Sequence, residues 1–221
     1  MDFSTVDAVL FDMDGTLIDS DAAVERGWLR WADEYGVDRQ TARPGVVHGS
    51  PSDHTVRRLR PDLDGPAFAA AVARQLAIQY DDVLDIVPIT GAHELLAELD
   101  RRSIRWAVVT SADTRLAGLR LAAAGITPPL LISVDDISAG KPDPEGYLLA
   151  ARRLGVDPAR CLVVEDAEPG VQAGRAAGSR VSSPARPGCL PRPRSWPRTA
   201  ARRRVRGRRR PAGRSPGRRA G

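Results

Sequence analysis

The chain has 221 residues, of which 42% are apolar and 5% aromatic. That length is enough for one domain with a buried core, or for one domain with an insertion. No apolar run approaches the roughly 20 residues of a membrane-spanning helix, and no secretory signal is recognisable. The two cysteines form neither a disulfide framework nor a metal cluster. We therefore expect a cytoplasmic protein with no membrane partner.

The net charge of +5 combines two parts of opposite sign. From Arg180 onward there are 15 arginines and no acidic residue, whereas residues 1–179 hold 18 basic and 28 acidic residues, a net charge of −10. From Val181 onward, 31 of 41 residues are Arg, Pro, Gly or Ala, which leaves few large apolar side chains for a core. We expect residues 181–221 to be a disordered basic tail.

The first predicted strand, at 6–12, is followed by a long helical stretch. Residues 21–84 have one helical pattern after another, separated by Gly/Pro turns such as the one at 43–45. Helices in this position indicate a cap inserted between the first and second strands of a sheet. Trp28, Trp31 and Tyr35 recur at helical spacing, so we expect them to form the core of this cap.

After residue 84, apolar runs alternate with helical patterns. The runs are continuous and end at polar residues, as in strands covered on both faces, at 106–110, 130–134 and 161–165. The helical patterns lie at 93–101, 115–124, 145–154 and 170–177. This alternation predicts a doubly wound α/β fold with a parallel sheet, formed by residues 1–20 and 85–180.

An aspartate pair follows the first predicted strand. Asp12 and Asp14 are two residues apart, and Gly15 permits a turn that lets both carboxylates face one centre. One carboxylate could attack phosphorus while the other transfers a proton to the leaving oxygen. Alone, the motif could equally be an ordinary turn rich in Asp and Gly.

Three further groups follow later strands. Thr110 and Ser111 offer a hydroxyl and a backbone N–H to a phosphoryl oxygen, although such residues often only cap helices. Lys141 is the one lysine among 33 basic residues, and Pro142 and Pro144 follow it. Prolines on one side fix the backbone, which favours an ammonium directed at a ligand over one that is solvated. Glu165 and Asp166 offer oxygen ligands to Mg²⁺, or alternatively cap a helix.

Together these groups make up the parts needed for phosphoryl transfer. The segments FDMDGTLIDS, VVTSA, GKPDPEGY and VVEDAEPGVQAG resemble the haloacid dehalogenase-like superfamily, from about residue 5 to about residue 180. The resemblance implies a Rossmann-like core with a helical cap. It places the chain with the capped subclass that includes sugar phosphatases and β-phosphoglucomutase.

The resemblance also implies a role for each group. Asp12 would be the nucleophile that forms an aspartyl-phosphate, and Asp14 the general acid and base. Thr110, the Ser111 backbone and Lys141 would hold the phosphoryl group. Mg²⁺ would be bound by Asp12, the Asp14 carbonyl and Asp166, with Glu165 either a ligand or a neighbour of the ligands.

The cap indicates the substrate class. It resembles the caps of sugar- and polyol-phosphate phosphatases. The resemblance implies that His48 and Gly49 of this chain would face the substrate. The related mutases carry a histidine and an arginine where this chain has Val24 and Ser52, so we favour a hydrolase acting on a small phosphorylated sugar or polyol. A phosphosugar mutase is the alternative. We expect a monomer.

The carboxyl end departs from the family. Where a strand, a loop and a helix would continue, the chain has an Arg/Pro-rich stretch, which we interpret as the product of a shifted reading frame near Val181. Two other interpretations of the protein remain: an inactive remnant of an enzyme, and a protein that binds polyanions through its tail. Because few aromatic residues accompany the arginines, we do not expect a role with nucleic acid.

Overall fold

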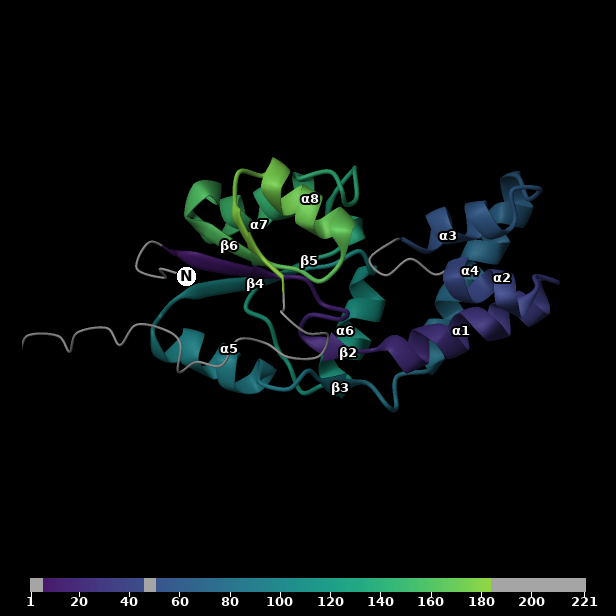
Figure 1. The fold of residues 1–221 in the computed structure, drawn as a ribbon, viewed down its shortest axis with the longest axis horizontal. Coiled ribbons are helices and arrows are strands. Elements are labelled where there is room, and N and C mark those ends of the chain that lie inside the picture. Colours follow the sequence, from purple (N-terminus) through teal and green to yellow (C-terminus); the bar gives the residue numbers. More distant parts are fainter. Residues whose placement is uncertain (1–5, 46–50, 184–221) are drawn as a thin grey trace, which may run out of the picture.

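The computed structural model describes residues 6–45 and 51–183. Parallel strands form a central five-stranded sheet in the order β5-β4-β1-β6-β7 (Figure 1). These strands are β1 (Ala8–Phe11), β4 (Arg105–Val109), β5 (Leu131–Ile132), β6 (Cys161–Val164) and β7 (Arg180–Ser182). The predicted doubly wound parallel sheet is confirmed, with β1 paired to β4 on one side and to β6 on the other.

Both faces of the sheet are covered by helices, as the continuous apolar runs predict. Val9 and Phe11 of β1 join a buried cluster with α5 (Ala92–Arg101) and α6 (Thr114–Ala123) on one face. Ala8 and Leu10 join a second cluster with α7 (Glu145–Leu154) and α8 (Glu168–Ala176) on the other face (Figure 1). Alternate residues of one strand thus build two cores. Two short 3₁₀ helices, η2 (Val134–Asp136) and η3 (Pro158–Arg160), precede α7 and β6.

Four helices stand together beside the sheet domain (Figure 1). They are α1 (Asp21–Glu34), α2 (Arg39–Gly45), α3 (Ser52–Leu59) and α4 (Gly65–Asp81), and we call them the helical group. Trp28 and Trp31 are buried in its own apolar cluster, and the Trp31 indole N–H donates to the Ala71 carbonyl at 2.9 Å. The expected core role of these tryptophans is confirmed. The Gly/Pro segment at 43–45, predicted as a turn, instead ends α2.

A short antiparallel ribbon joins the helical group to the sheet domain. Its strands, β2 (Ile18–Asp19) and β3 (Val87–Pro88), lie where the chain leaves for α1 and where it returns from α4. Arg26 of α1 forms ion pairs with Asp82 at 2.8 Å and with Asp85 at 2.6 Å, just before β3. The two connections therefore run side by side.

The sheet extends into the range predicted as tail. Val181 and Ser182 pair with Val163 and Val164 in β7, while residues 184–221 lie outside the described residues. Within the described part of the chain, no helix is both long and apolar enough to cross a membrane.

Candidate active site

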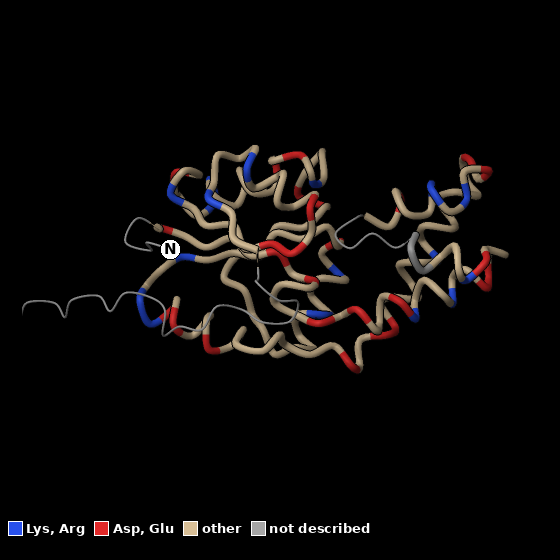
Figure 2. The backbone as a smooth tube through the Cα atoms, viewed as in Figure 1, with Lys and Arg blue, Asp and Glu red and all other residues tan. Residues whose placement is uncertain are grey.

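The sequence motifs meet at one edge of the sheet. Asp12 follows β1, Thr110 follows β4 and Glu165 follows β6, and carboxyl ends of parallel strands lie at the same edge. The Asp12 backbone N–H donates to the Val164 carbonyl at 2.9 Å, which fixes Asp12 beside the end of β6. Figure 2 shows acidic segments gathered at the end of the sheet that faces the helical group.

Lys141 lies at the centre of this edge. Its Nζ is 2.5 Å from Asp12 Oδ1, 2.6 Å from Glu165 Oε1 and 3.0 Å from the Val109 carbonyl. An ammonium has three protons, so every donor of Lys141 has an acceptor within the protein. Only 6% of the side chain is exposed. Lys141 therefore links the nucleophile motif to the acid-pair motif.

Burial changes the protonation of these groups. Burial raises the pKa of the Asp12 carboxyl well above its usual value, and the negative charge of Glu165 raises it further. Burial alone would lower the pKa of Lys141, but the nearby charge of Asp12 and then of Glu165 leaves this pKa well above its usual value. The ammonium is thus charged, and it lies between the carboxyl groups of Asp12 and Glu165.

Glu165 is fully engaged within the protein. Its Oε1 accepts hydrogen bonds from Lys141 and from the Tyr147 hydroxyl at 3.0 Å, and its Oε2 accepts from the Ala167 backbone N–H at 3.1 Å. The side chain is 1% exposed. These contacts orient Glu165 toward Lys141.

Three carboxylates form a cluster that could hold a metal ion. Asp12, Glu165 and Asp166 each offer an oxygen, and these atoms all lie within 4.8 Å of one another. Thr16 Oγ1 donates to Asp166 Oδ1 at 3.3 Å. Hard oxygen donors from three carboxyl groups fit a divalent cation such as Mg²⁺.

Gly15 allows Asp166 to reach this cluster. A Cβ atom at position 15 would lie 2.1 Å from Asp166 Oδ2, and the φ of Gly15 is +79°, in the region that favours glycine. Glycine is therefore required at position 15 for two reasons: a side chain would clash with Asp166, and the backbone conformation favours glycine.

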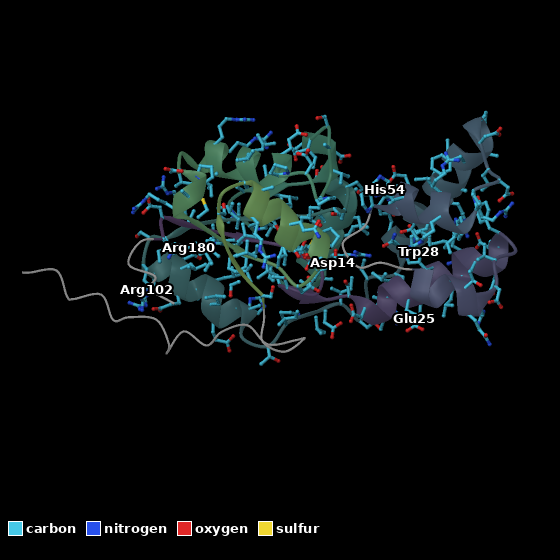
Figure 3. All side chains as sticks on the ribbon, turned by 45° about the horizontal axis from the view of Figure 1, so that its top comes forward. Asp14, Glu25, Trp28, His54, Arg102 and Arg180 are labelled. Carbon is cyan, nitrogen blue, oxygen red and sulfur yellow. The ribbon has the colours of Figure 1, made fainter. Side chains whose placement is uncertain are left out.

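Asp14 lies next to a cavity between the sheet domain and the helical group. Figure 3 shows Asp14 at the end of the sheet domain that faces the helices, with Trp28 on the helical side. The cavity has a volume of about 250 Å³. The helical group contributes Val24, Trp28, Ser52 and Gln79 to its wall. The sheet domain contributes Ser111 and Arg120.

The two hydroxyl residues are positioned differently. Thr110 Oγ1 accepts a hydrogen bond from the Ala112 backbone N–H at 3.1 Å and keeps its own proton for another acceptor. Ser111 Oγ is buried in the cavity wall and has no hydrogen-bond partner among the described residues. Both can donate to a ligand. The predicted substrate residues His48 and Gly49 lie outside the described residues.

Some residues of the site were missed by sequence reasoning. Tyr147 holds Glu165, Ser20 donates to Asp14 at 2.5 Å, and Arg120 pairs with Asp14 at 2.9 Å. A signal for Arg120 did exist, because it stands four residues after Leu116 on the apolar face of α6. Ser20 and Tyr147 lie at the ends of the segments FDMDGTLIDS and GKPDPEGY, but nothing in the sequence indicates that they contact Asp14 and Glu165.

Alanine at position 170 is expected to disturb the whole centre. A Cβ atom at Gly170 would lie 1.6 Å from Glu165 Oε1, so Glu165 would have to leave Lys141 and Tyr147. We expect Gly170→Ala to lower the free energy of unfolding by about 1–3 kcal/mol. Because the centre is displaced, activity is expected to fall by about 10²-fold. Denaturant unfolding and steady-state kinetics measure the two effects.

Gly118 provides the matched control. It lies within α6 with no atom within 4 Å of an added Cβ, so Gly118→Ala is expected to stabilise the protein by about 0.5–1 kcal/mol and to keep full activity. Equal behaviour of the two variants would show that Glu165 is free to move, contrary to the contacts described above.

Comparisons with known proteins agree with this geometry. The family model described as haloacid dehalogenase-like hydrolase matches residues 6–178. Hexitol phosphatase A of Escherichia coli K12 is 37% identical over 184 residues, covering 83% of this chain and 85% of the relative. The 2-deoxyglucose-6-phosphate phosphatase 1 of Saccharomyces cerevisiae is 33% identical over 196 residues, covering 79% and 78%.

A solved structure has the same fold. The CbbY protein of Rhodobacter sphaeroides, in complex with xylulose-(1,5)bisphosphate, superimposes with a TM-score of 0.71 and 25% sequence identity, covering 80% of this chain and 85% of that one. The chain belongs to the haloacid dehalogenase-like hydrolase family. Its predicted enzyme class, a phosphoric monoester hydrolase, is confirmed by the phosphatases among its relatives.

Proposed function

We propose that this protein is a Mg²⁺-dependent phosphatase that hydrolyses small sugar or polyol phosphates through an aspartyl-phosphate on Asp12. The observation that carries the proposal is the buried contact of Asp12 with Lys141 at 2.5 Å, inside a cluster of three carboxylates. A carboxylate that attacks a phosphate dianion needs nearby positive charge, which this centre is built to supply.

The first chemical step transfers the phosphoryl group to the protein. Lys141 binds Asp12 Oδ1, and no described group donates to Oδ2, which is the oxygen that would attack phosphorus. The bond from phosphorus to the ester oxygen breaks, and Asp14 donates a proton to the departing alkoxide. Thr110 Oγ1 and the Ser111 N–H would bind the phosphoryl oxygens, while Lys141 stabilises the centre mainly by its charge, since all its protons are in use.

The second step releases phosphate. Asp14, now a carboxylate, takes a proton from a water molecule that attacks phosphorus, and the bond from phosphorus to Asp12 breaks. Mg²⁺, when bound, would neutralise the phosphoryl oxygens and the nucleophile. We assign Asp12, the Asp14 carbonyl and Asp166 as the groups that would hold it. Glu165, whose oxygens are engaged by Lys141, Tyr147 and Ala167, would stand beside the ligands.

The size and the lining of the cavity support a small polar substrate. Its volume of about 250 Å³ lies below the roughly 300–1,000 Å³ of pockets for drug-sized ligands. Much of the wall is apolar, and the hydroxyl, amide and carboxylate groups within it suit a hydroxylated chain or ring. We assign residues 21–84 as a cap over a catalytic core of residues 1–20 and 85–180, with His48 and Gly49 as further substrate contacts. The relatives that act on hexitol and 2-deoxyglucose phosphates support this class.

Hydrolysis is favoured over a mutase reaction. A mutase must hold an intermediate and return its phosphoryl group, and in the related mutases a histidine and an arginine are present for this purpose. Here the corresponding Val24 and Ser52 both lie in the cavity wall. Neither carries a charge at neutral pH, so water is the expected acceptor of the phosphoryl group.

A panel of substrates tests the proposal. Purified full-length protein is incubated with sorbitol 6-phosphate, 2-deoxyglucose 6-phosphate and glucose 1-phosphate, and phosphate release is measured with Mg²⁺ and after chelation by EDTA. We expect Mg²⁺-dependent release from at least one of the sugar or polyol phosphates.

Two outcomes would contradict the proposal. A folded protein that releases no phosphate from any member of the panel would support the inactive-remnant reading. Conversion of glucose 1-phosphate to glucose 6-phosphate without net phosphate release would support the mutase.

Activity in a variant that lacks residues 184–221 would show that the enzyme does not depend on the basic tail. That result would contradict the interpretation of the protein as one that binds polyanions.

A further inference from the structure

Arg120 is a buried arginine in the wall of the cavity. It lies on α6, is 4% exposed, and donates from Nη1 to Asp14 Oδ1 at 2.9 Å. Among the described residues, Asp14 is the one carboxylate with which it forms an ion pair, and its Nε has no hydrogen-bond partner. A buried guanidinium with an unsatisfied donor opposes folding. Stability alone therefore does not account for a buried arginine at Asp14.

Arg120 also reaches the helical group. Its Nη2 donates to Gln79 Oε1 of α4 at 2.5 Å. Gln79 and Gln75 are hydrogen-bonded to each other through their amides, and Ser52 Oγ of α3 donates to Gln75 Oε1 at 3.1 Å. A chain of polar side chains, half-buried at Ser52 and Asp14 and buried between them, thus runs from α3 and α4, through Arg120, to Asp14.

The contacts leave one oxygen of Asp14 available. Ser20 Oγ donates to Oδ1 at 2.5 Å, and Arg120 also donates to Oδ1. No described group donates to Oδ2. Two donors on one oxygen fix the rotation of the carboxyl group, and the other oxygen can then exchange a proton with a substrate in the cavity, whose wall includes Asp14 itself.

We propose that Arg120 is a positioning residue for the Asp14 carboxyl group, and that Gln79 holds the Arg120 guanidinium in place from the helical group. The inference rests on the proposed function, in which Asp14 transfers the proton. Arg120 acts through Asp14 and touches neither phosphorus nor the metal cluster. Its loss should therefore impair the first step only where the leaving group needs a proton, whereas the second step, in which Asp14 takes a proton from water, would be affected for every substrate.

Two substrates separate these reactions. The alkoxide of sorbitol 6-phosphate needs a proton as it leaves, whereas the phenolate of 4-nitrophenyl phosphate does not. The ratio kcat/KM reports the step that phosphorylates Asp12 and is independent of the later attack by water. We expect Arg120→Met to lower kcat/KM for sorbitol 6-phosphate by about 10²-fold. The value for 4-nitrophenyl phosphate is expected to stay within about threefold.

Further variants test how Arg120 acts. Asp14→Asn should give the same selective loss, and adding Arg120→Met to it should cause little additional loss, because both changes remove one function. Gln79→Leu should give a smaller loss with the same selectivity, of about tenfold. Arg120→Lys keeps the charge and one hydrogen bond, so it should recover part of the activity.

The matched control is another arginine of α6. Arg115 lies over the Tyr80 ring at 4.3 Å, outside the contacts to Asp14, and Arg115→Met should leave both kcat/KM values unchanged. Equal losses on the two substrates in Arg120→Met, with normal unfolding in denaturant, would overturn the inference, as would losses that add fully in the double variant. If Arg120→Met does not fold, Gln79→Leu takes its place, and equal losses of kcat/KM on the two substrates in that variant would overturn the inference. If the wild type hydrolyses neither substrate, the proposed function fails and the inference with it.

Discussion

Replacing Asp12 with asparagine is expected to lower phosphatase turnover by about 10⁴-fold or more while the protein stays folded. Asparagine has nearly the same shape, but its amide is a far poorer nucleophile toward phosphorus. The buried Asp12 carboxyl has a raised pKa because burial disfavours its charge. The neutral amide removes that unfavourable charge, so the free energy of unfolding should be unchanged or higher. Phosphate release and denaturant unfolding measure the two effects.

A surface variant controls for the chemical change itself. Asp81 is exposed at the end of α4, and Asp81→Asn should keep both activity and stability. Full turnover in Asp12→Asn would exclude covalent catalysis by this side chain. A lost fold would instead mean that the contact between Asp12 and Lys141 is required mainly for stability.

Replacing Lys141 with methionine is expected to destabilise the protein by about 3–5 kcal/mol, because Asp12 and Glu165 would remain buried without their counter-ion. The pKa of Asp12 is already raised, and loss of the ammonium removes a charge that lowers it. A carboxyl whose pKa is higher in the folded than in the unfolded state loses stability as the pH rises. The free energy of unfolding of the variant should therefore lie furthest below that of the wild type at alkaline pH. Denaturant unfolding at several pH values measures this difference.

An exposed ion pair provides the comparison. Arg39 is 2.6 Å from Asp33, as close as Lys141 is to Glu165, but 62% of its side chain is exposed. Arg39→Met should cost much less because water already solvates both partners. Similar losses in the two variants would contradict the charge balance assigned to Lys141. Unchanged inhibition of Lys141→Met by inorganic phosphate would contradict its role toward the phosphoryl group.

The sheet could be predicted from the sequence because strands buried on both faces consist of apolar residues without interruption. Residues 8–11 and 161–164 are fully buried in β1 and β6, and the residues that follow them carry the chemistry. The meeting of Asp12, Lys141 and Glu165 followed from the same argument, since parallel strands end at a common edge.

The remaining features depend on tertiary contacts that leave little local signal. The strands β2 and β3 have two residues each and form only because the two ends of the helical group meet. The edge strand β7 reaches into the stretch whose Arg/Pro/Gly/Ala composition predicts a tail from Val181 onward, yet pairing with β6 makes Val181 and Ser182 part of a strand. The hydrogen bond from Tyr147 to Glu165 depends on α7 lying across the sheet.

The ribbon of β2 and β3 brings together the two chain connections between the helical group and the parent sheet. Because its entry and exit strands are hydrogen-bonded neighbours, the parent sheet closes in the same way whatever lies between them. The helices could be exchanged for those of a relative, joined at Asp19 and Val87, without altering the register of β1, β4 or β6. Substrate preference could thus diverge, by evolution or by design, provided that the new helices supply a partner for Arg120 in the place of Gln79.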